Sequence, residues 1–533
     1  MKSFLSAELK YKFMLSYLKK FRVVTSVLFL LFTSLLFLDV TGTITNEISE
    51  EVLFLQFIPS FLKFIDIATI AAIGFLIIII ITLLYGRVYC STICPLGIFQ
   101  DLIIYYKRKR EKIKFSFQPH FNWVRYSILV VTITAFLFGN LFLLYTLDPY
   151  SNYGRILTHL VKPLVIGINN VISYLLEIIN NYSVAPLSFN NINIFTLSFS
   201  LIILIIVFLF SYNSGRFFCN TLCPVGSLLG FLSKFSLFKI AVNKETCVRC
   251  GVCETVCKAE CIDSKKEVVD FTRCVSCFNC FAVCPTHGLK YEFQPSKIWN
   301  KENGEKEDLE RRSFLASIFA YTIGLTGFSY AQDKIEVYKK NKIPVIRPNP
   351  ISPPGSISIG HLSDYCTACH LCVSACPTHV LQPSFLEYGF TGMMLPMMNN
   401  KLGFCDYECT ICTDVCPTDA IKVIDVETKK RVQIGKAKFI KDNCIVYTQG
   451  TACGACSEHC PTKAVTMIPI ENNLQAPEVK EEICIGCGAC EFACPTIPYK
   501  AIFVESNPLH LIAEEPKKEI IDEQIDYSDD FPF

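Results

Sequence analysis

Long apolar runs separated by charged segments dominate the first 235 residues of the chain. Four of these runs approach the ~20 helical residues that are needed to cross the hydrocarbon core of a bilayer. They cover 23–38, 67–85, 128–147 and 194–212. The pattern predicts a helical membrane domain with four spans.

Basic residues are unevenly distributed around these runs. Six lysine and arginine residues precede the first run, and eight lie in the connection 86–127, whereas the two opposite connections hold one and two. Because basic residues accumulate on the cytoplasmic side of a membrane, we expect the N-terminus and the chain after Tyr212 to be cytoplasmic.

A twelve-residue motif occurs twice, after the second and after the fourth run. It reads Gly-Arg-x-x-Cys-x-x-x-Cys-Pro-x-Gly at 86–97 and again at 215–226. We therefore expect a two-fold repeat that brings four thiols together at the cytoplasmic membrane face, while Arg87 and Arg216 serve as orientation signals. The thiols would hold a seventh metal site or act as redox groups; alternatively, the motif only shapes the helix exits. The four are Cys90, Cys94, Cys219 and Cys223.

Three further apolar segments are too short or too polar to count among the four spans. We interpret 52–64 and 164–179 as interfacial helices, with a buried helix of a larger outer domain as the alternative. The stretch 311–331 begins with Arg311-Arg312 and resembles a twin-arginine export signal. Either as such a signal or as a plain fifth anchor span, it carries the following chain to the outer face. A cytoplasmic amphipathic hairpin is the third interpretation.

The composition narrows the class of protein. The chain has 29 cysteines but 8 histidines, and charged residues make up 18%, below the ~25% of soluble proteins. An odd number of cysteines in a long chain does not suit a disulfide framework, and a net charge of +2 does not indicate a nucleic-acid partner. The composition favours a membrane protein that binds metal centres through thiolates.

Most of the cysteines follow ferredoxin spacing, in which C-x-x-C-x-x-C and a distant fourth cysteine bind [4Fe–4S] clusters. After the fourth cysteine of the first motif, Cys257, Lys258 replaces the usual proline. We interpret the extra thiol of Cys261 as structural, with a role as an alternative cluster ligand as the second option. Because the fourth ligand often serves the neighbouring cluster, we expect two crossed sets. They are Cys247, Cys250, Cys253 with Cys284, and Cys274, Cys277, Cys280 with Cys257.

Four more motifs follow, and all of them end in Cys-Pro. The outer two have the standard spacing, while the middle two are stretched after the first cysteine. This symmetry favours nested pairing, first motif with fourth and second with third, which raises the expected number of clusters to six. The ligand sets are then Cys366, Cys369, Cys372 with Cys494; Cys484, Cys487, Cys490 with Cys376; Cys405, Cys409, Cys412 with Cys460; and Cys444, Cys453, Cys456 with Cys416.

Other metal sites fit these cysteines less well. Zinc sites seldom take three cysteines of such a run followed by Cys-Pro. The segment from Cys366 to His370 matches the attachment pattern of c-type haem, but the motif continues to Cys372 and Cys376. No histidine lies inside the four apolar runs, which argues against haem b in the membrane.

The expected fold class is an α-helical membrane domain, with four spans as a two-fold repeat and a fifth anchor span, joined to α+β ferredoxin-like domains. The C-terminal tail is acidic, and we interpret it as a solvated segment, with docking of a basic partner as the alternative. The predicted domains are a membrane domain (1–235), a cytoplasmic two-cluster ferredoxin (236–295), the anchor (296–332), a proline-rich linker (333–360), an outer four-cluster ferredoxin (361–512) and the tail (513–533).

Together these motifs resemble a known family. The spans, the two C-x-x-x-C-P motifs and the first ferredoxin resemble the membrane subunit of the quinol dehydrogenase that feeds periplasmic nitrate reductase. The membrane protein of nitrous-oxide-reductase maturation shares that core. The part from Arg311 onward, with Pro353-Pro354-Gly355, resembles the exported four-cluster partner subunit. The resemblance covers about 20–290 and 311–505 and implies a fusion of both subunits in the bacterial inner membrane, with the second ferredoxin in the periplasm.

The resemblance implies a quinol dehydrogenase-type component that oxidises menaquinol or ubiquinol and passes electrons to a periplasmic cytochrome or terminal reductase. Asp39, Asp148 and His159 lie near the outer ends of the first and third runs and are candidate proton acceptors; for the aspartates, a helix cap or an interfacial charge is the alternative. Two other functions stay open. One is an electron donor for metal reduction in the maturation of a copper or other metalloenzyme, and the other is a transmembrane conduit fed by cytoplasmic ferredoxin.

Overall fold

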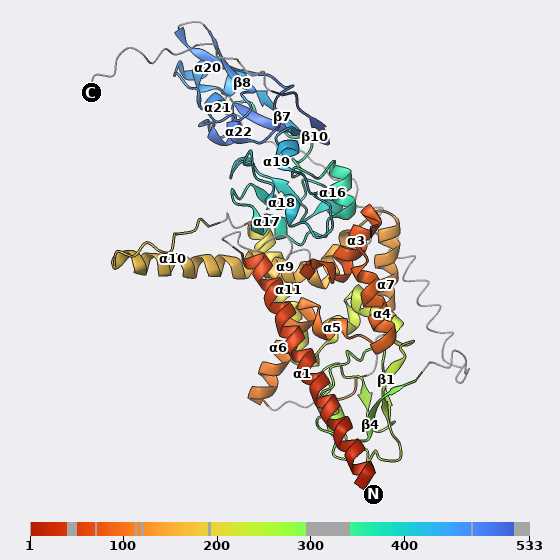
Figure 1. Ribbon diagram of the computed structural model, residues 1–533. Coiled ribbons are helices and arrows are strands. Elements are labelled where there is room, and N and C mark those ends of the chain that lie inside the picture. Colours follow the sequence, from red (N-terminus) through yellow and green to blue (C-terminus); the bar gives the residue numbers. More distant parts are fainter. Residues whose placement is uncertain are drawn as a thin grey trace, which may run out of the picture.

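The computed structural model describes most of the chain, with gaps in several connections (Figure 1). The fifth apolar stretch with its arginine pair, the first part of the linker and most of the acidic tail lie outside the described residues, and the expectations for them stay predictions. The described residues are 2–39, 51–69, 72–111, 115–118, 122–189, 193–294, 342–470 and 473–515.

The apolar runs form helices, but not four helices of equal length. α1 (Lys2–Leu38) and α11 (Ile194–Ser214) contain the first and fourth runs. α4 (Gly74–Tyr85) and α7 (Asn122–Leu137) have only 12 and 16 residues, about 18 and 24 Å at 1.5 Å per residue. In the described chain, three stretches are long and apolar enough to cross a membrane, and one of them, Pro149–Ile178, is not among the four predicted spans.

Turns inside two apolar runs explain the short helices. Gly139 has a φ of 75°, a left-handed conformation that ends α7, and the chain restarts as α8 (Phe142–Leu147). Ala68 has a φ of 52° and ends α3 (Phe57–Ile67) before α4 begins. Hydropathy averages over such turns, so it predicted one span where the run 128–147 forms two helices, and a longer span than α4 where the run 67–85 begins at the end of α3.

The two expected interfacial helices differ from each other. α9 (Pro149–Ile156), the π-helical turn η2 (Leu157–Val161) and α10 (Lys162–Ile178) follow one another. Figure 1 shows α10 projecting from the bundle crosswise to α1, and its apolar residues Leu164 and Ile168 are exposed. Because α10 belongs to the apolar stretch Pro149–Ile178, which is long enough to cross a membrane, its interfacial placement stays a prediction. α3 buries Phe57, Ile58 and Leu62 in the common core, so it packs more closely on the bundle than α10 does, and its interfacial placement stays a prediction.

Each copy of the repeated motif forms a short helix and then a longer one. The first cysteine lies in α5 (Tyr89–Thr92) or α12 (Phe217–Thr221), and proline begins α6 (Pro95–Glu111) or α13 (Pro224–Ser233). Proline suits a first helical position because its missing N–H would have no partner there. Cys223 caps α13, since its Sγ accepts a hydrogen bond from Gly226 N at 3.3 Å.

The first ferredoxin unit is a small α+β fold. Strands β1 (Phe238–Val242) and β4 (Leu289–Phe293) pair antiparallel, with Phe238 opposite Phe293. The hairpin β2 (Ile262–Asp263) and β3 (Val268–Val269) and the short helix α14 (Val252–Thr255) lie between them in sequence.

The second ferredoxin region has two halves, each built around an antiparallel hairpin. β5 (Leu381–Pro383) pairs with β6 (Pro396–Met398) in the first half, and β8 (Val465–Pro469) pairs with β9 (Gln475–Val479) in the second. β7 (Val432–Phe439) and β10 (Ile502–Ile512) form a third antiparallel pair. The short helices are α16 (Ile359–Tyr365), α17 (Leu371–Ala375), α18 (Ile411–Asp414), α19 (Val426–Lys429), α20 (Ile445–Gln449), α21 (Ala455–Glu458) and α22 (Ala489–Ala493).

The two ferredoxin regions lie at opposite ends of α1. Figure 1 shows the first beside the N-terminal part of α1 and the second beyond its C-terminal end. One continuous apolar core includes Phe37 of α1, Phe271 of the first region and Leu371 of the second, whereas the last half of the second region has a core of its own around Ile502. The membrane helices and the adjoining ferredoxin parts are therefore packed as one body.

Candidate metal centres and the docking of the ferredoxin regions

The four loops with standard C-x-x-C-x-x-C spacing share one backbone conformation. In each loop, the residue two positions after the first cysteine and the residue directly after the second cysteine have a positive φ, between 48° and 83°. Most of these residues are not glycine, so the same unfavourable conformation at equivalent positions marks a conserved turn shape. The residues are Arg249 and Gly251, Ser276 and Phe278, Ala368 and His370, and Gly486 and Gly488.

Backbone N–H groups point at several of the thiols. Ala368 N donates to Cys366 Sγ at 3.3 Å, and Gly288 N donates to Cys284 Sγ at 3.2 Å. Hydrogen bonds to sulfur stabilise a thiolate and tune the potential of an iron–sulfur cluster. The donors that these loops present therefore fit [4Fe–4S] clusters.

The thiols of the first ferredoxin region form two crossed groups. The thiol neighbours of Cys253 are Cys284, Cys250 and Cys247. Those of Cys280 include Cys277, Cys274 and Cys257. Each group of four therefore takes three thiols from one motif and the fourth from the other, which is the arrangement that crossed ligand sets require.

The nested pairing predicted for the second region is wrong, because neighbouring motifs pair in sequence. The expected partners Cys494, Cys376, Cys460 and Cys416 each lie in another group. Hairpins β5–β6 and β8–β9 fold the first motif onto the second and the third onto the fourth, which the symmetry of the spacings did not reveal. The observed groups are Cys366, Cys369, Cys372 with Cys416; Cys405, Cys409, Cys412 with Cys376; Cys444, Cys453, Cys456 with Cys494; and Cys484, Cys487, Cys490 with Cys460.

The spacing within these groups is wide. Among the described residues, no three histidine, cysteine, aspartate or glutamate side chains lie close enough to hold a single metal ion. A zinc ion needs all its sulfur ligands within about 2.3 Å of one centre, whereas the thiolates of a [4Fe–4S] cluster bind different iron atoms.

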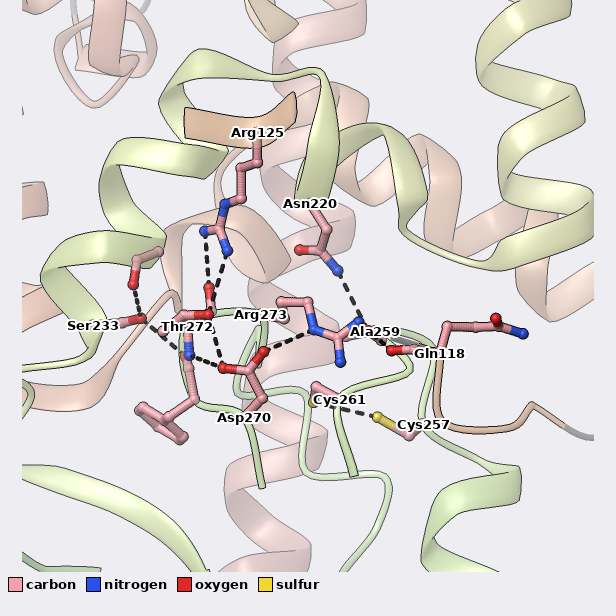
Figure 2. Close-up of polar contacts among 12 residues, drawn as sticks. Gln118, Arg125, Asn220, Ser233, Cys257, Ala259, Cys261, Asp270, Thr272 and Arg273 are labelled. Atoms are coloured by element: carbon pink, nitrogen blue, oxygen red, sulfur yellow. Dashed lines mark hydrogen bonds and ion pairs between the residues drawn. The ribbon is translucent and has the colours of Figure 1, made fainter. Parts of the chain in front are cut away.

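Cys261 lies against the second thiol group of the first ferredoxin region. Its Sγ is 3.5 Å from Cys257 Sγ (Figure 2), it also contacts the Cys274 thiol, and it is 1% exposed. The spare cysteine is therefore placed to donate a hydrogen bond to one of the proposed cluster ligands.

The two copies of the membrane motif are joined by reciprocal arginine contacts. Arg87 Nη2 donates to Cys219 O at 3.1 Å, and Arg216 Nη1 donates to Cys90 O at 2.6 Å. Glycine is required at the end of each motif, because a Cβ on Gly97 or Gly226 would lie 2.4 or 2.1 Å from these carbonyl oxygens. Both arginines are fully buried, so they cross-link the two copies of the motif; their predicted role as orientation signals stays a prediction.

The four membrane thiols lie together inside this cross-linked core. The thiols of Cys219, Cys90 and Cys223 are neighbours of the Cys94 thiol. All four cysteines are at most 4% exposed, and Arg87 Nη2 lies 3.8 Å from Cys90 Sγ. The expected convergence of the two motifs is therefore present in the structure.

One carboxylate connects this core to the first ferredoxin region. Asp101 pairs with Arg216 at 2.8 Å between Nη2 and Oδ2, and also with Lys258. Burial alone would raise the pKa of Asp101, but the charges of Arg216 and Lys258 outweigh it and hold the pKa well below its ordinary value. Lys258 thus takes the place of the usual proline because it docks the ferredoxin loop on the membrane half.

A second set of contacts docks the other ferredoxin region. Arg155 Nε donates to Ala368 O at 2.9 Å, and Lys162 Nζ donates to Ser374 O at 2.6 Å. His370 Nε2 lies 2.8 Å from Met394 O, a carbonyl that only accepts, so Nδ1 accepts from His159 Nε2 at 2.7 Å. Two ion pairs, Lys63 with Asp419 and Asp66 with Lys422, add to the interface.

The three candidate proton acceptors have different surroundings. Asp148 is the N-cap of α9, where its Oδ2 accepts from Ser151 N at 2.8 Å, so the capping alternative describes it. Asp39 is half-buried at the end of α1, and its carbonyl accepts from Lys162 Nζ. His159 contacts the first cysteine loop of the second ferredoxin region. The sequence motifs did not identify Arg155 and Lys162 as functional residues. The signal that could have identified them is a basic residue within an otherwise apolar helix.

We expect Asp101→Asn to weaken the docking of the first ferredoxin region. Removing one partner of a buried ion pair costs about 3–5 kcal/mol, because Arg216 and Lys258 lose their counter-charge. The pKa of Asp101 is lowered by folding, so its contribution is complete at neutral pH and is lost as the pH falls below about 4, toward the folded value. Thermal unfolding and hydrogen exchange of 255–275 in the purified protein measure this.

The matched control is Glu427→Gln, which removes an exposed ion pair with Lys430 and should leave both measurements unchanged. Unaltered exchange of 255–275 in Asp101→Asn would show that the carboxylate is not what holds the ferredoxin loop.

We expect Cys261→Ala to lower the midpoint potential of one cluster of the first ferredoxin region, because a hydrogen bond to a ligand sulfur is lost. The change should be roughly tens of millivolts, given that ~59 mV corresponds to a tenfold change for one electron. Cys261→Ser keeps a donor and should restore much of the potential. A redox titration followed by EPR makes the comparison, and equal midpoints in all three proteins would contradict it.

Comparisons with known proteins agree with this geometry. A family described as "4Fe-4S binding domain" matches residues 67–113 and 196–243, which contain the two membrane motifs. A "4Fe-4S dicluster domain" matches 365–421, and another matches 450–497. The first dicluster match covers the first motif pair of the second region, and the second match covers the other sequential pair except Cys444. No solved structure matches the chain.

Similar proteins match slightly less than half of the chain. The ferredoxin-type protein NapH of Haemophilus influenzae is 24% identical over 48% of this chain and 77% of its own length. NapH of Escherichia coli is 26% identical over 41% of this chain and 66% of its length. The protein MJ0749 of Methanocaldococcus jannaschii is 26% identical over 40% of this chain and 68% of its length. The chain is therefore a fusion of a membrane half that resembles the NapH-like ferredoxin-type proteins with two further 4Fe-4S dicluster domains, and it is an iron–sulfur electron-transfer protein.

Proposed function

We propose that the protein oxidises menaquinol or ubiquinol in the bacterial inner membrane and delivers the electrons, through its second ferredoxin region, to a cytochrome or reductase in the periplasm. The observation that carries the proposal is the docking of the Cys366–Cys376 loop directly on the membrane helices. Arg155, His159 and Lys162 all reach this loop, so the first thiol group of that region lies next to the part of the protein that a lipid-soluble donor reaches.

The proposal assigns six [4Fe–4S] clusters to the six thiol groups, with sequential pairing in the second region. When bound, such clusters supply transfer of one electron at a time. The contribution of the chain is to fix their positions: Arg155 holds the carbonyl of Ala368 between two ligands, and Lys162 holds Ser374 two residues before another. Because the helices that carry these cations also pack in the common core, the first loop is held rigidly against the membrane half.

Oxidation of a quinol releases two protons, and we assign the first acceptor to His159. Its Nε2 donates to His370, which leaves Nδ1 as the basic nitrogen of the ring. Asp39 is the second acceptor in the proposal, since it lies beside Lys162 at the end of α1. Asp148 is left with its capping role.

We expect His159→Gln to slow quinol-dependent reduction by about 10²-fold or more, the usual contribution of a general base. Glutamine retains an N–H donor for His370 but has no basic nitrogen. The measurement is the rate at which a menaquinol analogue reduces the clusters of the anaerobic, cluster-loaded protein, followed by EPR. His510→Gln is the control, because His510 bonds to Ser352 in the second ferredoxin region, away from the membrane contact.

If the analogue reduces none of the clusters while a soluble ferredoxin does, quinol oxidation is wrong and the protein works as a conduit. If quinol reduces both variants at the wild-type rate, quinol remains the donor and the role of His159 is wrong.

A transmembrane conduit is the second candidate, and the four membrane thiols favour it. Asp148 lies close enough to Cys223 and to Tyr150 to interact electrostatically with both, and Cys369 and Cys416 are also neighbours of Tyr150. Arg87 bonds both to Cys219 O and to Thr272 O, which is two residues before Cys274. The membrane thiols therefore lie between the two ferredoxin regions, where a seventh metal centre or a redox-active thiol pair would connect them.

We expect combined serine substitution of Cys90, Cys94, Cys219 and Cys223 to lower the iron content and to stop electron transfer from a reduced soluble ferredoxin to the second region, if the conduit operates. Ser227→Ala is the control, since its hydroxyl is buried beside the motif without a hydrogen-bond partner in the described structure. Unchanged iron and unchanged transfer in the serine variant would eliminate a metal or redox role for the motif.

A further inference from the structure

A polar cavity of about 200 Å³ lies between the membrane half and the first ferredoxin region. It is bordered by the start of α7, by α12 and by the loop that leads to β2. Eight of its ten lining residues have polar side chains, and Gln118 and Asn122 open it to solvent. The lining residues are Gln118, Asn122, Arg125, Ser214, Phe217, Asn220, Thr221, Ala259, Glu260 and Arg273.

Two buried arginines of the lining have N–H groups without a partner. Arg125 donates to Thr272 O at 3.0 Å and to Gly226 O at 3.4 Å, but its Nε has no acceptor. Arg273 pairs with Asp270 at 2.8 Å and donates to Gln118 O at 3.1 Å, while its Nη2 is buried and unpaired. In Figure 2, Arg125 reaches toward Thr272, and Arg273 lies between Asp270 and Gln118. The two side chains are 2% and 7% exposed.

The lining holds two arginines and one glutamate, and Asp270 pairs with one of the arginines from outside the lining. Arg273 forms its ion pair with Asp270, and Arg125 donates hydrogen bonds to carbonyl and hydroxyl oxygens. Glu260 is the acidic residue of the lining. Buried guanidinium groups are costly unless they are paired, so the site is suited to a ligand that brings negative charge and several acceptors.

We propose that this cavity binds a phosphate group, either as the headgroup of an anionic phospholipid or as part of a soluble phosphate compound. Phosphate oxygens match the forked geometry of arginine, and the amides of Asn220 and Gln118 and the hydroxyls of Thr221 and Ser214 supply further donors. The many polar side chains of the lining suit a phosphate better than a quinone headgroup, whose sites are mainly apolar. The proposal is independent of the electron donor assigned above.

The position of the cavity gives the bound anion a consequence. Ala259 and Glu260 lie between Cys257 and Cys261, and Arg273 directly precedes Cys274. Negative charge against these two loops disfavours an added electron there. Binding of phosphate would therefore lower the reduction potential of the adjacent centre.

The test uses the full-length, cluster-loaded protein in nanodiscs of phosphatidylcholine, titrated with inorganic phosphate and followed by isothermal titration calorimetry. Arg125→Gln should weaken binding about tenfold or more, because it removes one charge-assisted interaction. Glu260→Gln should tighten binding, since it removes the carboxylate that opposes the anion. Arg249→Gln is the matched control, an exposed arginine of the same region that pairs with Glu267, and it should bind as the wild type does.

A second arm identifies the source of the phosphate. If nanodiscs with one quarter phosphatidylglycerol abolish the binding of inorganic phosphate, the lipid headgroup occupies the cavity; if binding persists, the ligand is soluble. The proposal is overturned if neither inorganic phosphate nor retained phosphatidylglycerol, measured by native mass spectrometry, binds stoichiometrically. Glu260→Gln removes none of the contacts made by the arginines. The proposal is also overturned if this variant binds inorganic phosphate and phosphatidylglycerol with the wild-type affinities.

Discussion

Buried positive charge is the constraint on which the assembly depends. Arg87, Arg216 and Lys258 are at most 4% exposed, and an unpaired buried charge costs several kcal/mol. Their partners come from three parts of the chain: Asp101 follows the first motif, the carbonyl of Cys219 belongs to the second, and Thr272 belongs to the first ferredoxin region. No part can satisfy its own cations, so the two motif copies and the ferredoxin region have to assemble together.

The same principle operates at the other end of α1. There Arg155 and Lys162 donate to carbonyls of the first cysteine loop of the second ferredoxin region. In both places a cation from the membrane half bonds to a backbone carbonyl close to a proposed ligand cysteine. A backbone carbonyl near a ligand cannot move without moving the whole cysteine loop. These contacts therefore fix the distances between the proposed clusters and the membrane half, and electron transfer depends on such distances.

Local sequence predicted the cysteine loops well because their shape is local. The left-handed residues follow the C-x-x-C-x-x-C spacing itself, and the crossing in the first region follows from two motifs in one small fold. The nested pairing failed because it depended on which motifs a hairpin brings together. The stretched segment after Cys444 forms α20 within its own motif and carries no information about the partner. Likewise, apolar runs predicted membrane helices but not the turns at Ala68 and Gly139 that shorten them.

The sequence by itself determined the chemistry of the protein: the thiol groups, the repeated membrane motif, and the apolar and charged pattern of a membrane protein, since each of these is encoded by neighbouring residues. Only the tertiary structure decided the pairing of the four motifs in the second ferredoxin region, the reciprocal contacts of Arg87 and Arg216, the docking role of Lys258 and the position of Cys261 beside Cys257. These features join residues far apart in the chain, and they exist because buried charges and thiols need partners that their own segments do not contain.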